Sequence, residues 1–246
     1  MGARNGSKIC SKIWPQMTNW IIVVAGGRGQ RMGLGFNKIF AKIGKYPVIY
    51  WTLAAFEKSK TIDKIVISAS KSDISDIAKL IKKYGFAKVS NIIPSSESRQ
   101  SSTLDVLAAV SFKKADLVGV HNGVNPFVTD SELKEVFSNA KRYGAALLAQ
   151  KARDTVKITN GDGRVVNTPI RQYVWYAQTP QVATFGNLLK AHEKARKDKF
   201  SGTDDAQLLE RIGIRPKIVE CSSKNFKITF REDLIMANFI LKSWGR

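Results

Sequence analysis

Cysteine is scarce in this sequence, and long apolar runs are missing. The only two cysteines among the 246 residues are Cys10 and Cys221, and such a pair fits neither the spacing of a zinc site nor a disulfide framework. No apolar stretch approaches the roughly 18 residues that a membrane-spanning helix needs. The opening residues lack the apolar segment of a secretory signal. These absences favour a cytoplasmic protein with two reduced thiols and no membrane-embedded part.

Acidic residues are few relative to basic ones. The chain has 20 Asp and Glu against 40 Lys and Arg, which gives a formal net charge of +20 and a pI near 10.0. Such a surface attracts polyanions. However, the basic residues are spread along the chain, and the sequence contains no zinc finger, aromatic RNA-binding stripe or basic leucine zipper. Anionic small-molecule substrates or a basic host proteome therefore explain the charge more simply than nucleic-acid binding.

Length and hydrophobic content fit one domain. With 246 residues, of which 43% are hydrophobic, the chain suffices for one sizeable core. Residues 1–18 are polar, basic and without periodicity, so we expect a disordered extension there. The folded domain is then expected to cover residues 19–246.

Short apolar runs alternate with amphipathic stretches along most of the chain. Buried parallel strands read as apolar runs, whereas the helices between them show a period of about 3.6 residues. We expect strands at about 20–25, 64–69, 88–93, 115–120, 145–150 and 215–220, and helices at about 48–58, 72–84, 99–110, 129–143, 184–196, 204–211 and 231–242. This alternation predicts an α/β fold with a mostly parallel, twisted sheet that is flanked by helices.

The pattern changes between residues 153 and 171. Two short β-prone stretches, at 156–159 and 164–167, flank the turn-forming tetrad Asn160-Gly161-Asp162-Gly163. We therefore predict a β-hairpin that projects from the domain as an arm.

A glycine-rich turn follows the first predicted strand. It reads Ala25-Gly26-Gly27-Arg28-Gly29-Gln30-Arg31-Met32, and Lys38 follows shortly after it. Ligands of an open parallel sheet bind beyond the carboxyl ends of the strands, and glycines let backbone N–H groups approach phosphate oxygens. The spacing matches neither the dinucleotide-binding motif nor the P-loop. The turn is therefore either a phosphate site of another kind or a plain glycine-rich turn with solvated cations.

Two further segments place polar side chains beside an expected strand end or helix start. His121 begins the segment His-Asn-Gly-Val-Asn-Pro at the end of the fourth predicted strand, where a lone histidine is more often a hydrogen-bonded packing residue than a catalyst. Thr203-Asp204-Asp205 precedes a predicted helix, which Thr203 or Asp204 could cap. Lys227 lies in a later extended stretch.

Six motifs, taken in order, resemble one enzyme family. They are A-G-G-x-G-x-R-M with its following lysine, H-x-x-x-x-P, R-D-T-V-K, Q-T-P-Q, T-D-D-A and K-I-T, which begin at residues 25, 121, 153, 178, 203 and 227. Any one motif is weak, but this ordered set resembles the 2-C-methyl-D-erythritol 4-phosphate cytidylyltransferases over residues 19–242. The cytidylyltransferases that act on ribitol 5-phosphate are close relatives with the same signatures.

The resemblance implies a single Rossmann-like nucleotidyltransferase domain and a reaction. A cytidylyl group would pass from CTP to 2-C-methyl-D-erythritol 4-phosphate, which gives 4-diphosphocytidyl-2-C-methyl-D-erythritol and pyrophosphate in the non-mevalonate route to isoprenoids. It implies Mg²⁺ or another divalent cation as cofactor. It also implies a homodimer in which the hairpin arm, at about residues 153–171, crosses to the partner subunit.

The same resemblance assigns residues to roles. The catalytic cations are Arg31, Lys38 and Lys227. The residues that bind CTP are Ala25, Gly26, Gly27, Arg28 and Gly29 around the triphosphate, and Ser96, Glu97 and Ser102 around the cytosine, where the family's usual glycine pair is Ser95-Ser96. The acceptor site comprises Asn122, Asn125, Thr155, Arg171, Thr179 and Thr203.

Two positions depart from the family pattern. Where the family reads H-D-A-A-R-P, Asn122 replaces the aspartate and Asn125 replaces the arginine. An amide oxygen can still bind a metal, so Asn122 is a weak metal ligand, but it lacks the charge that holds Mg²⁺, and Asn125 cannot form the two-pronged contact of an arginine. The acceptor could therefore differ from the family's, the activity could be reduced, or the chain could be a catalytically silent nucleotide-binding paralogue.

Overall fold

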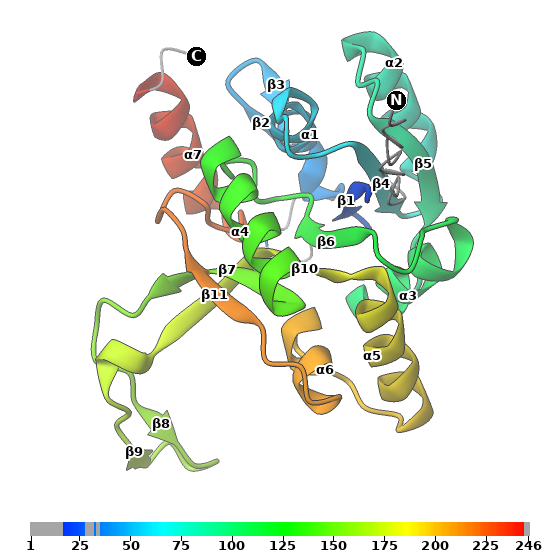
Figure 1. Ribbon diagram of the computed structural model, residues 1–246. Helices are drawn as coiled ribbons and strands as arrows, with labels where there is room; N and C mark the ends of the chain where they lie inside the picture. Colours follow the sequence, from blue (N-terminus) through cyan, green and yellow to red (C-terminus); the bar gives the residue numbers. More distant parts are fainter. Residues whose placement is uncertain (1–16, 28–31, 33–34, 244–246) are drawn as a thin grey trace, which may run out of the picture.

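Seven strands form the central sheet of the structure (Figure 1). The computed structural model describes residues 17–27, 32 and 35–243. The strands, in spatial order, are β11 (Lys217–Glu220), β7 (Ala145–Lys151), β10 (Trp175–Thr184), β6 (Leu117–Asn122), β1 (Asn19–Val24), β4 (Lys64–Ala69) and β5 (Val89–Pro94). Neighbouring strands run parallel except where β10 pairs with β6 and β7. The mostly parallel sheet predicted from the sequence is thus confirmed.

Helices cover both faces of this sheet. The helices are α1 (Val48–Lys58), α2 (Ile74–Tyr84), α3 (Arg99–Ala109), α4 (Asp130–Tyr143), α5 (Phe185–Lys197), α6 (Asp205–Arg211) and α7 (Arg231–Ser243). Ile21 and Val23 of β1 pack in a core with α1, α2, α4 and α7, whereas Trp20 and Ile22 pack in a second core with α3, α5 and α6. Because successive side chains of a strand point to opposite faces, burial on both faces explains the uninterrupted apolar run of β1.

Several element boundaries agree with the sequence pattern. Helix α1 and strand β4 begin and end at the predicted residues. The hydroxyl of Thr129 accepts a hydrogen bond from the Glu132 backbone N–H (3.3 Å), and the Glu132 carboxylate accepts one from the Thr129 N–H (2.8 Å). This capping box fixes the start of α4, where a hydroxyl three residues before a glutamate predicted it.

Strand β10 was not predicted. Its sequence contains Pro180, which cannot donate to a ladder and usually marks an edge strand or no strand. The register of β10 against β7 shifts between Ala177 and Gln181, so Pro180 falls in the irregular stretch between two regular ladders. This break lets an antiparallel strand run through the middle of the sheet, and within it Thr179 Oγ1 accepts a hydrogen bond from the Asn122 N–H at the end of β6 (3.3 Å).

The predicted hairpin arm is confirmed as a projection from the domain (Figure 1). Strands β8 (Ile158–Thr159) and β9 (Val165–Asn167) pair antiparallel. Asn160 Oδ1 accepts hydrogen bonds from the backbone of Asp162 (3.2 Å) and Arg164 (3.0 Å), which closes the turn. The arm continues through a 3₁₀ turn, η3 (Arg171–Tyr173), into β10. A second small hairpin, β2 (Lys42–Ile43) with β3 (Tyr46–Pro47), was not anticipated.

The folded domain begins slightly earlier than the sequence indicated. Thr18, which was assigned to the extension, donates from its backbone to Asp116 Oδ1 (3.0 Å) and accepts from the Leu117 N–H (3.1 Å). Met17 packs against the core. The rest of the expected extension, residues 1–16, lies outside the described residues. Within the described part of the chain, no helix has the length and apolar character needed to cross a membrane.

Candidate functional site

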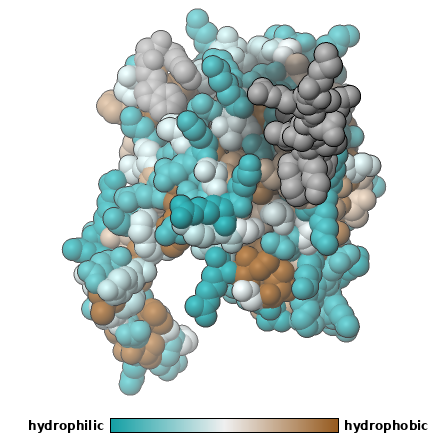
Figure 2. Space-filling model, viewed as in Figure 1, coloured by the Kyte–Doolittle hydropathy of each residue, from teal (hydrophilic) through white to brown (hydrophobic). Residues whose placement is uncertain are grey.

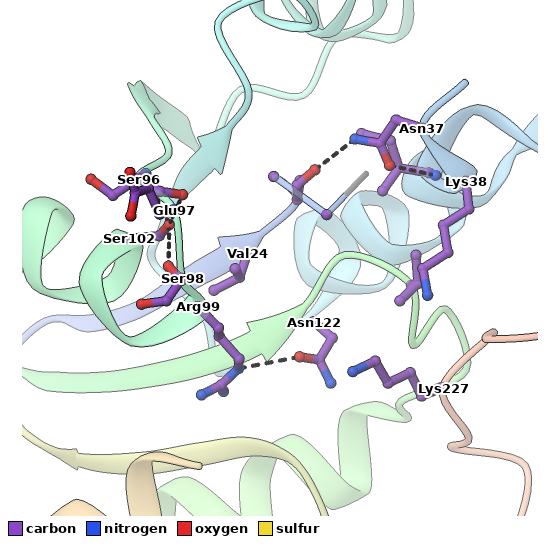
Figure 3. Close-up of a pocket in the computed structure, with 15 residues that line it drawn as sticks. Val24, Asn37, Lys38, Ser96, Glu97, Ser98, Arg99, Ser102, Asn122 and Lys227 are labelled. Carbon is purple, nitrogen blue, oxygen red and sulfur yellow. Dashed lines mark hydrogen bonds between the residues drawn. The ribbon is translucent and has the colours of Figure 1, made fainter. Parts of the chain in front are cut away.

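A cavity of about 310 Å³ opens at the carboxyl ends of β1 and β6, beside the start of α3 (Figure 3). Its lining consists of Val24, Ala25, Gly26, Gly27, Asn37, Lys38, Ile39, Ser96, Glu97, Ser98, Arg99, Ser102, Asn122, Val124 and Lys227. Every described residue that the sequence assigned to CTP or to catalysis is in this set. The strand-end location is the one at which open α/β sheets bind ligands.

The glycine pair after β1 has two different structural roles. A Cβ on Gly26 would lie 2.3 Å from Ser95 Oγ, so only glycine lets the segment after β5 pack this closely. A Cβ on Gly27 would meet nothing within 4 Å, so the chain at Gly27 is open toward the cavity. Arg28, Gly29 and Arg31, which were predicted to complete this loop, lie outside the described residues.

Asn37 holds the turn that presents Lys38. Its Nδ2 donates to the Ala25 carbonyl (2.9 Å) and to Asp73 Oδ2 (2.8 Å), while its Oδ1 accepts from the Ile39 N–H (3.2 Å). The last bond caps a 3₁₀ turn, η2 (Lys38–Phe40). Lys38 is buried in the wall of the cavity, and its position relative to the glycine-rich turn is fixed by the Asn37 amide.

A serine-rich loop forms the opposite wall. The buried Ser102 hydroxyl accepts from the Ser96 N–H (3.1 Å) and donates to the Ser98 carbonyl (2.7 Å). Ser98 caps α3 with a bond to Ser101. In Figure 3 this serine cluster and the two lysines lie on opposite sides of the cavity, with Arg99 and Asn122 between them. The cavity therefore has a hydroxyl-rich end, to which Glu97 adds a carboxylate, and a positively charged end.

A second cavity, of about 340 Å³, adjoins the first. Its lining consists of Arg99, Asn122, Ala177, Gln178, Thr179, Gln181, Thr203, Asp204 and Lys227. Three of these residues, Arg99, Asn122 and Lys227, line both cavities. Two ligands could therefore meet at a boundary that carries two cationic side chains and one amide.

Arg99 is anchored at this boundary by a buried carboxylate. Its Nη2 lies 2.6 Å from Asp205 Oδ2, and the Asp205 side chain is only 1% exposed. His192 Nε2 lies 3.0 Å from Asp205 Oδ1. Burial by itself raises the pKa of Asp205, but the charge of Arg99 and the hydrogen bond from His192 outweigh it and hold this pKa well below its ordinary value. Asp205 is therefore ionised, and it fixes the guanidinium between the cavities.

His121 is a packing residue, as its isolated position in the sequence indicated. It is fully buried, its ring meets Phe56 edge to face at 4.9 Å, and Nε2 lies 2.9 Å from the Asn125 carbonyl. Because a carbonyl can only accept, Nε2 must carry the proton. Burial lowers the pKa of His121 from 6.5 to about 4; the Asn125 bond opposes this, and the charge of Arg99 adds to it. The ring is thus neutral at pH 7.

The predicted acceptor residues fall into three groups. Asn122, Thr179 and Thr203 line the second cavity. Asn125 is fully buried and lines neither cavity. Thr155 and Arg171 are exposed on the hairpin arm, where Arg171 Nη1 donates to the Arg153 carbonyl (3.1 Å). Within one chain, the structure does not bring these two arm residues to either cavity.

Several lining residues were not assigned to the site from the sequence. Among them are Asn37, Ser98, Arg99 and Gln178, which all line a cavity. Arg99 carried a usable signal, because it opens a predicted helix directly after a predicted strand, where an open sheet places its ligands. Gln178 belongs to the Q-T-P-Q motif, but β10, the strand that contains it, was not predicted, so its location at a cavity could not be inferred. Asn37 and Ser98 act through backbone contacts that no periodicity reports.

Comparison with known proteins relates the chain to one enzyme family. The sequence model of the family described as 2-C-methyl-D-erythritol 4-phosphate cytidylyltransferase (IspD) matches residues 20–243. The protein of that name from Bacillus cytotoxicus is 41% identical over 221 residues, which cover 90% of this chain and 96% of the relative. Its counterpart from Geobacter metallireducens is 37% identical, over 92% of this chain and 98% of the relative.

Solved structures give the same result. The 4-diphosphocytidyl-2C-methyl-D-erythritol synthase of Anaerococcus prevotii superposes with a TM-score of 0.82 at 30% identity, over 92% of this chain and 96% of the other. The 2-C-methyl-D-erythritol 4-phosphate cytidylyltransferase of Francisella tularensis superposes with a TM-score of 0.75 at 30% identity, over 90% and 99% of the two chains. The chain therefore belongs to the 2-C-methyl-D-erythritol 4-phosphate cytidylyltransferase family, a family of nucleotidyltransferase enzymes.

Proposed function

We propose that this protein transfers a cytidylyl group from CTP to 2-C-methyl-D-erythritol 4-phosphate and releases pyrophosphate. The observation that carries the proposal is the pair of adjoining cavities that share Arg99, Asn122 and Lys227. A reaction between two bound anions requires two sites that meet at a cationic boundary. The substrates named for the relatives, a nucleotide and a polyol phosphate, match this division.

The first cavity suits CTP. Its lysine end and the open backbone at Gly27 suit the triphosphate, since glycine lets the main chain approach phosphate oxygens and lysines supply the opposing charge. Its serine end offers hydroxyls and backbone groups around Ser96 and Ser102 for the cytosine. The second cavity then takes the acceptor, with Thr179 and Thr203 in its wall.

The proposed reaction is an in-line displacement. A phosphate oxygen of the acceptor forms a bond to the α-phosphorus of CTP, the bond between the α-phosphorus and the bridging oxygen breaks, and the electron pair leaves with pyrophosphate. The acceptor oxygen is already anionic, so no general base is required. The barrier comes from bringing two anions together, and positioning and charge neutralisation therefore dominate. Lys38 and Lys227, with Arg31, are proposed to stabilise the developing charge.

Mg²⁺ is proposed to enter with CTP. No group of three His, Cys, Asp or Glu side chains that could hold a metal is present in residues 17–27, 32 and 35–243, and Asn122 Oδ1 already accepts a hydrogen bond from Arg99 Nε (3.4 Å). Mg²⁺ commonly retains waters and is held by substrate phosphates with few protein ligands. Its chemistry here is to neutralise phosphate charge while Lys38 and Lys227 orient the triphosphate.

The hairpin arm suits a homodimer with shared sites. Val166, Ile170 and Tyr173 on or beside the arm are 61%, 66% and 72% exposed, and Figure 2 shows hydrophobic side chains gathered on this projection. Exposed apolar groups of this kind mark interaction surfaces. We propose that the arm packs on a second copy and delivers Thr155 and Arg171 to the partner subunit's acceptor cavity, because neither residue reaches the cavity of its own chain.

One structural feature favours a different acceptor as a second candidate. Asn122 and Asn125 remove two charges that the family pattern places beside the acceptor, so ribitol 5-phosphate or a related polyol phosphate is an alternative substrate. A pyrophosphate-release assay with CTP and a panel of polyol phosphates decides between them. We expect the highest kcat/KM with 2-C-methyl-D-erythritol 4-phosphate. Release with none of the panel, despite measurable CTP binding, would instead identify a silent paralogue, and salt-dependent retention on DNA without CTP turnover would favour a nucleic-acid-binding role.

A further inference from the structure

Three side-chain amides form a chain of hydrogen bonds from Arg99 to the second cavity. Arg99 Nε donates to Asn122 Oδ1 (3.4 Å), Asn122 Nδ2 donates to Asn125 Oδ1 (3.2 Å), and Asn125 Nδ2 donates to Gln178 Oε1 (3.5 Å). The first two residues of this chain lie at the site boundary in Figure 3. Its last member, Gln178, lines the second cavity.

Chemistry fixes the direction of this chain. An arginine has donors only, so Asn122 must turn its carbonyl oxygen to Arg99 and its NH₂ group to Asn125. Asn125 must then present its oxygen to Asn122 and its NH₂ group to Gln178, which places Gln178 Oε1 toward Asn125. The Gln178 NH₂ group is the last donor in this series of hydrogen bonds. Within the part of the chain that the structure describes, no acceptor for a hydrogen bond from Gln178 Nε2 is present.

Arg99 and the two asparagines of these hydrogen bonds are held in place by further contacts. Arg99 is anchored by the buried Asp205 carboxylate at 2.6 Å. Asn125 is fully buried, its N–H donates to the Asn122 carbonyl (3.1 Å), and its own carbonyl accepts from His121 (2.9 Å). The Asn122 N–H donates to Thr179 Oγ1 (3.3 Å), next to Gln178. An amide in such surroundings is costly to turn over, because a buried polar group left without a partner costs about 1–3 kcal/mol.

The geometry points to Gln178 as a specificity-determining residue for the acceptor, which donates a hydrogen bond from Nε2 to a hydroxyl oxygen of the polyol chain, with Asn122 and Asn125 as positioning residues. This inference rests on the proposed function for the identity of the acceptor. Residues 122 and 125 carry no charge here, and the role that the family pattern gives to an aspartate and an arginine passes to one neutral donor. A neutral donor suits a hydroxyl, while the phosphate of the acceptor has the cationic boundary at Arg99 and Lys227.

Gln178→Met tests the donor, because methionine has a similar length and cannot donate. We expect the KM for the polyol phosphate to rise about tenfold, the effect of one lost neutral hydrogen bond, with the KM for CTP within about twofold. Analogues that each lack one hydroxyl give the sharper measurement. One of them should be about tenfold poorer than the parent with the unaltered protein, and equal to the parent with the variant. Gln150→Met is the matched control, because Gln150 bonds to Ser222 and Asn225 and lines neither cavity.

Asn122→Asp tests the relay, that is, the hydrogen bonds from Arg99 through Asn122 and Asn125 that orient Gln178. A carboxylate at position 122 cannot donate, so the Asn125 amide must turn over, and Gln178 must then present its oxygen to the cavity. In this background Gln178→Met should change the KM for the acceptor by less than about twofold, a strong departure from additivity. Equal effects of Gln178→Met in the unaltered protein and in Asn122→Asp would show that Gln178 acts without the relay. That result would overturn the positioning role of Asn122 and Asn125.

Calorimetric titration of each polyol phosphate, in the presence of a CTP analogue with a methylene bridge between the α- and β-phosphorus, separates this inference from the proposed function. Turnover with no effect of Gln178→Met on hydroxyl discrimination overturns the inference and retains the function. Binding without turnover, with hydroxyl discrimination that disappears in Gln178→Met, supports the inference and rejects the function. Absence of both binding and turnover overturns both.

Discussion

His121 Nε2 lies 2.9 Å from the backbone carbonyl of Asn125. This bond crosses the loop that follows β6, and it holds Asn125 where the side chain can contact both Asn122 and Gln178. The histidine thus supports the site through the Asn125 backbone, and it lines neither cavity. Its neutral state is part of that support, because a protonated ring would be buried among apolar side chains and beside the charge of Arg99.

Stability should therefore fall on mild acidification. The pKa of His121 is about 4 in the folded protein, against an ordinary 6.5, so between these values the unfolded chain binds a proton that the folded chain does not, and lowering the pH favours unfolding. We expect His121 to account for a loss of about 2 kcal/mol between pH 7 and pH 5. Urea unfolding at both values, for the unaltered protein and for His121→Gln, measures this difference. Identical pH dependence of the two proteins would contradict it.

Removal of either cavity lysine should impair the chemical step. Lys38→Ala and Lys227→Ala should each lower kcat by at least about 100-fold, because the charge that they oppose develops in the transition state. Circular dichroism and thermal unfolding should remain close to those of the unaltered protein. Lys79→Ala is a suitable control, since Lys79 is exposed on α2 and forms an ion pair with the exposed Asp76 one turn away. Near-normal turnover in both cavity variants would reject their catalytic assignment.

Local sequence patterns predicted the layers of the fold because the periodicity of a strand or a helix is a local property of the chain. The apolar run of β4 and the amphipathic period of α1 gave correct boundaries for both. Strand β10 was not predicted because Pro180 argues against a strand. The register shift between the two ladders of β10 is what makes Pro180 compatible with the sheet. That compatibility depends on the neighbouring strands, which a single segment of sequence does not report.

In the candidate site too, features within one segment were predicted, whereas contacts between distant segments were not. The glycine-rich turn and Lys38 were predicted from the order of motifs. The ion pair between Arg99 and Asp205 joins the first residues of α3 and α6, and no spacing rule connects residues so distant in sequence. The burial of Asn125 could not be predicted either, because asparagine is usually exposed and its hydrogen-bond partners include Gln178, which is distant in sequence.

Subunit mixing tests whether the arm completes the partner's site. Arg171→Ala and Lys38→Ala dimers should each be inactive, but after subunit exchange a mixed dimer would contain one site with both lesions and one site with neither. Equal mixing should therefore restore about a quarter of the sites of a symmetric dimer. Arg171→Ala mixed with Thr155→Ala is the control, because both lesions lie on the arm and each site of a mixed dimer would keep one of them. Exchange without recovery in the first mixture would reject shared sites.

The last prediction concerns the metal requirement at position 122. If the family aspartate helps to hold Mg²⁺, Asn122→Asp should lower the Mg²⁺ concentration for half-maximal rate at saturating acceptor, because a carboxylate attracts the cation more strongly than an amide. Arg99, whose Nε lies 3.4 Å from Asn122 Oδ1, would compete for the new charge. Asn125 is buried and lines neither cavity, so Asn125→Arg should strengthen the gain only where the longer side chain reaches the second cavity, where its cation would bind the acceptor and offset the repulsion between the carboxylate and phosphate. If both asparagines instead fit another acceptor, the double variant should shift preference toward 2-C-methyl-D-erythritol 4-phosphate with little change in Mg²⁺ dependence. Rates against Mg²⁺ for two acceptors separate these outcomes, and an unchanged metal requirement in Asn122→Asp would exclude a role for this position in metal binding.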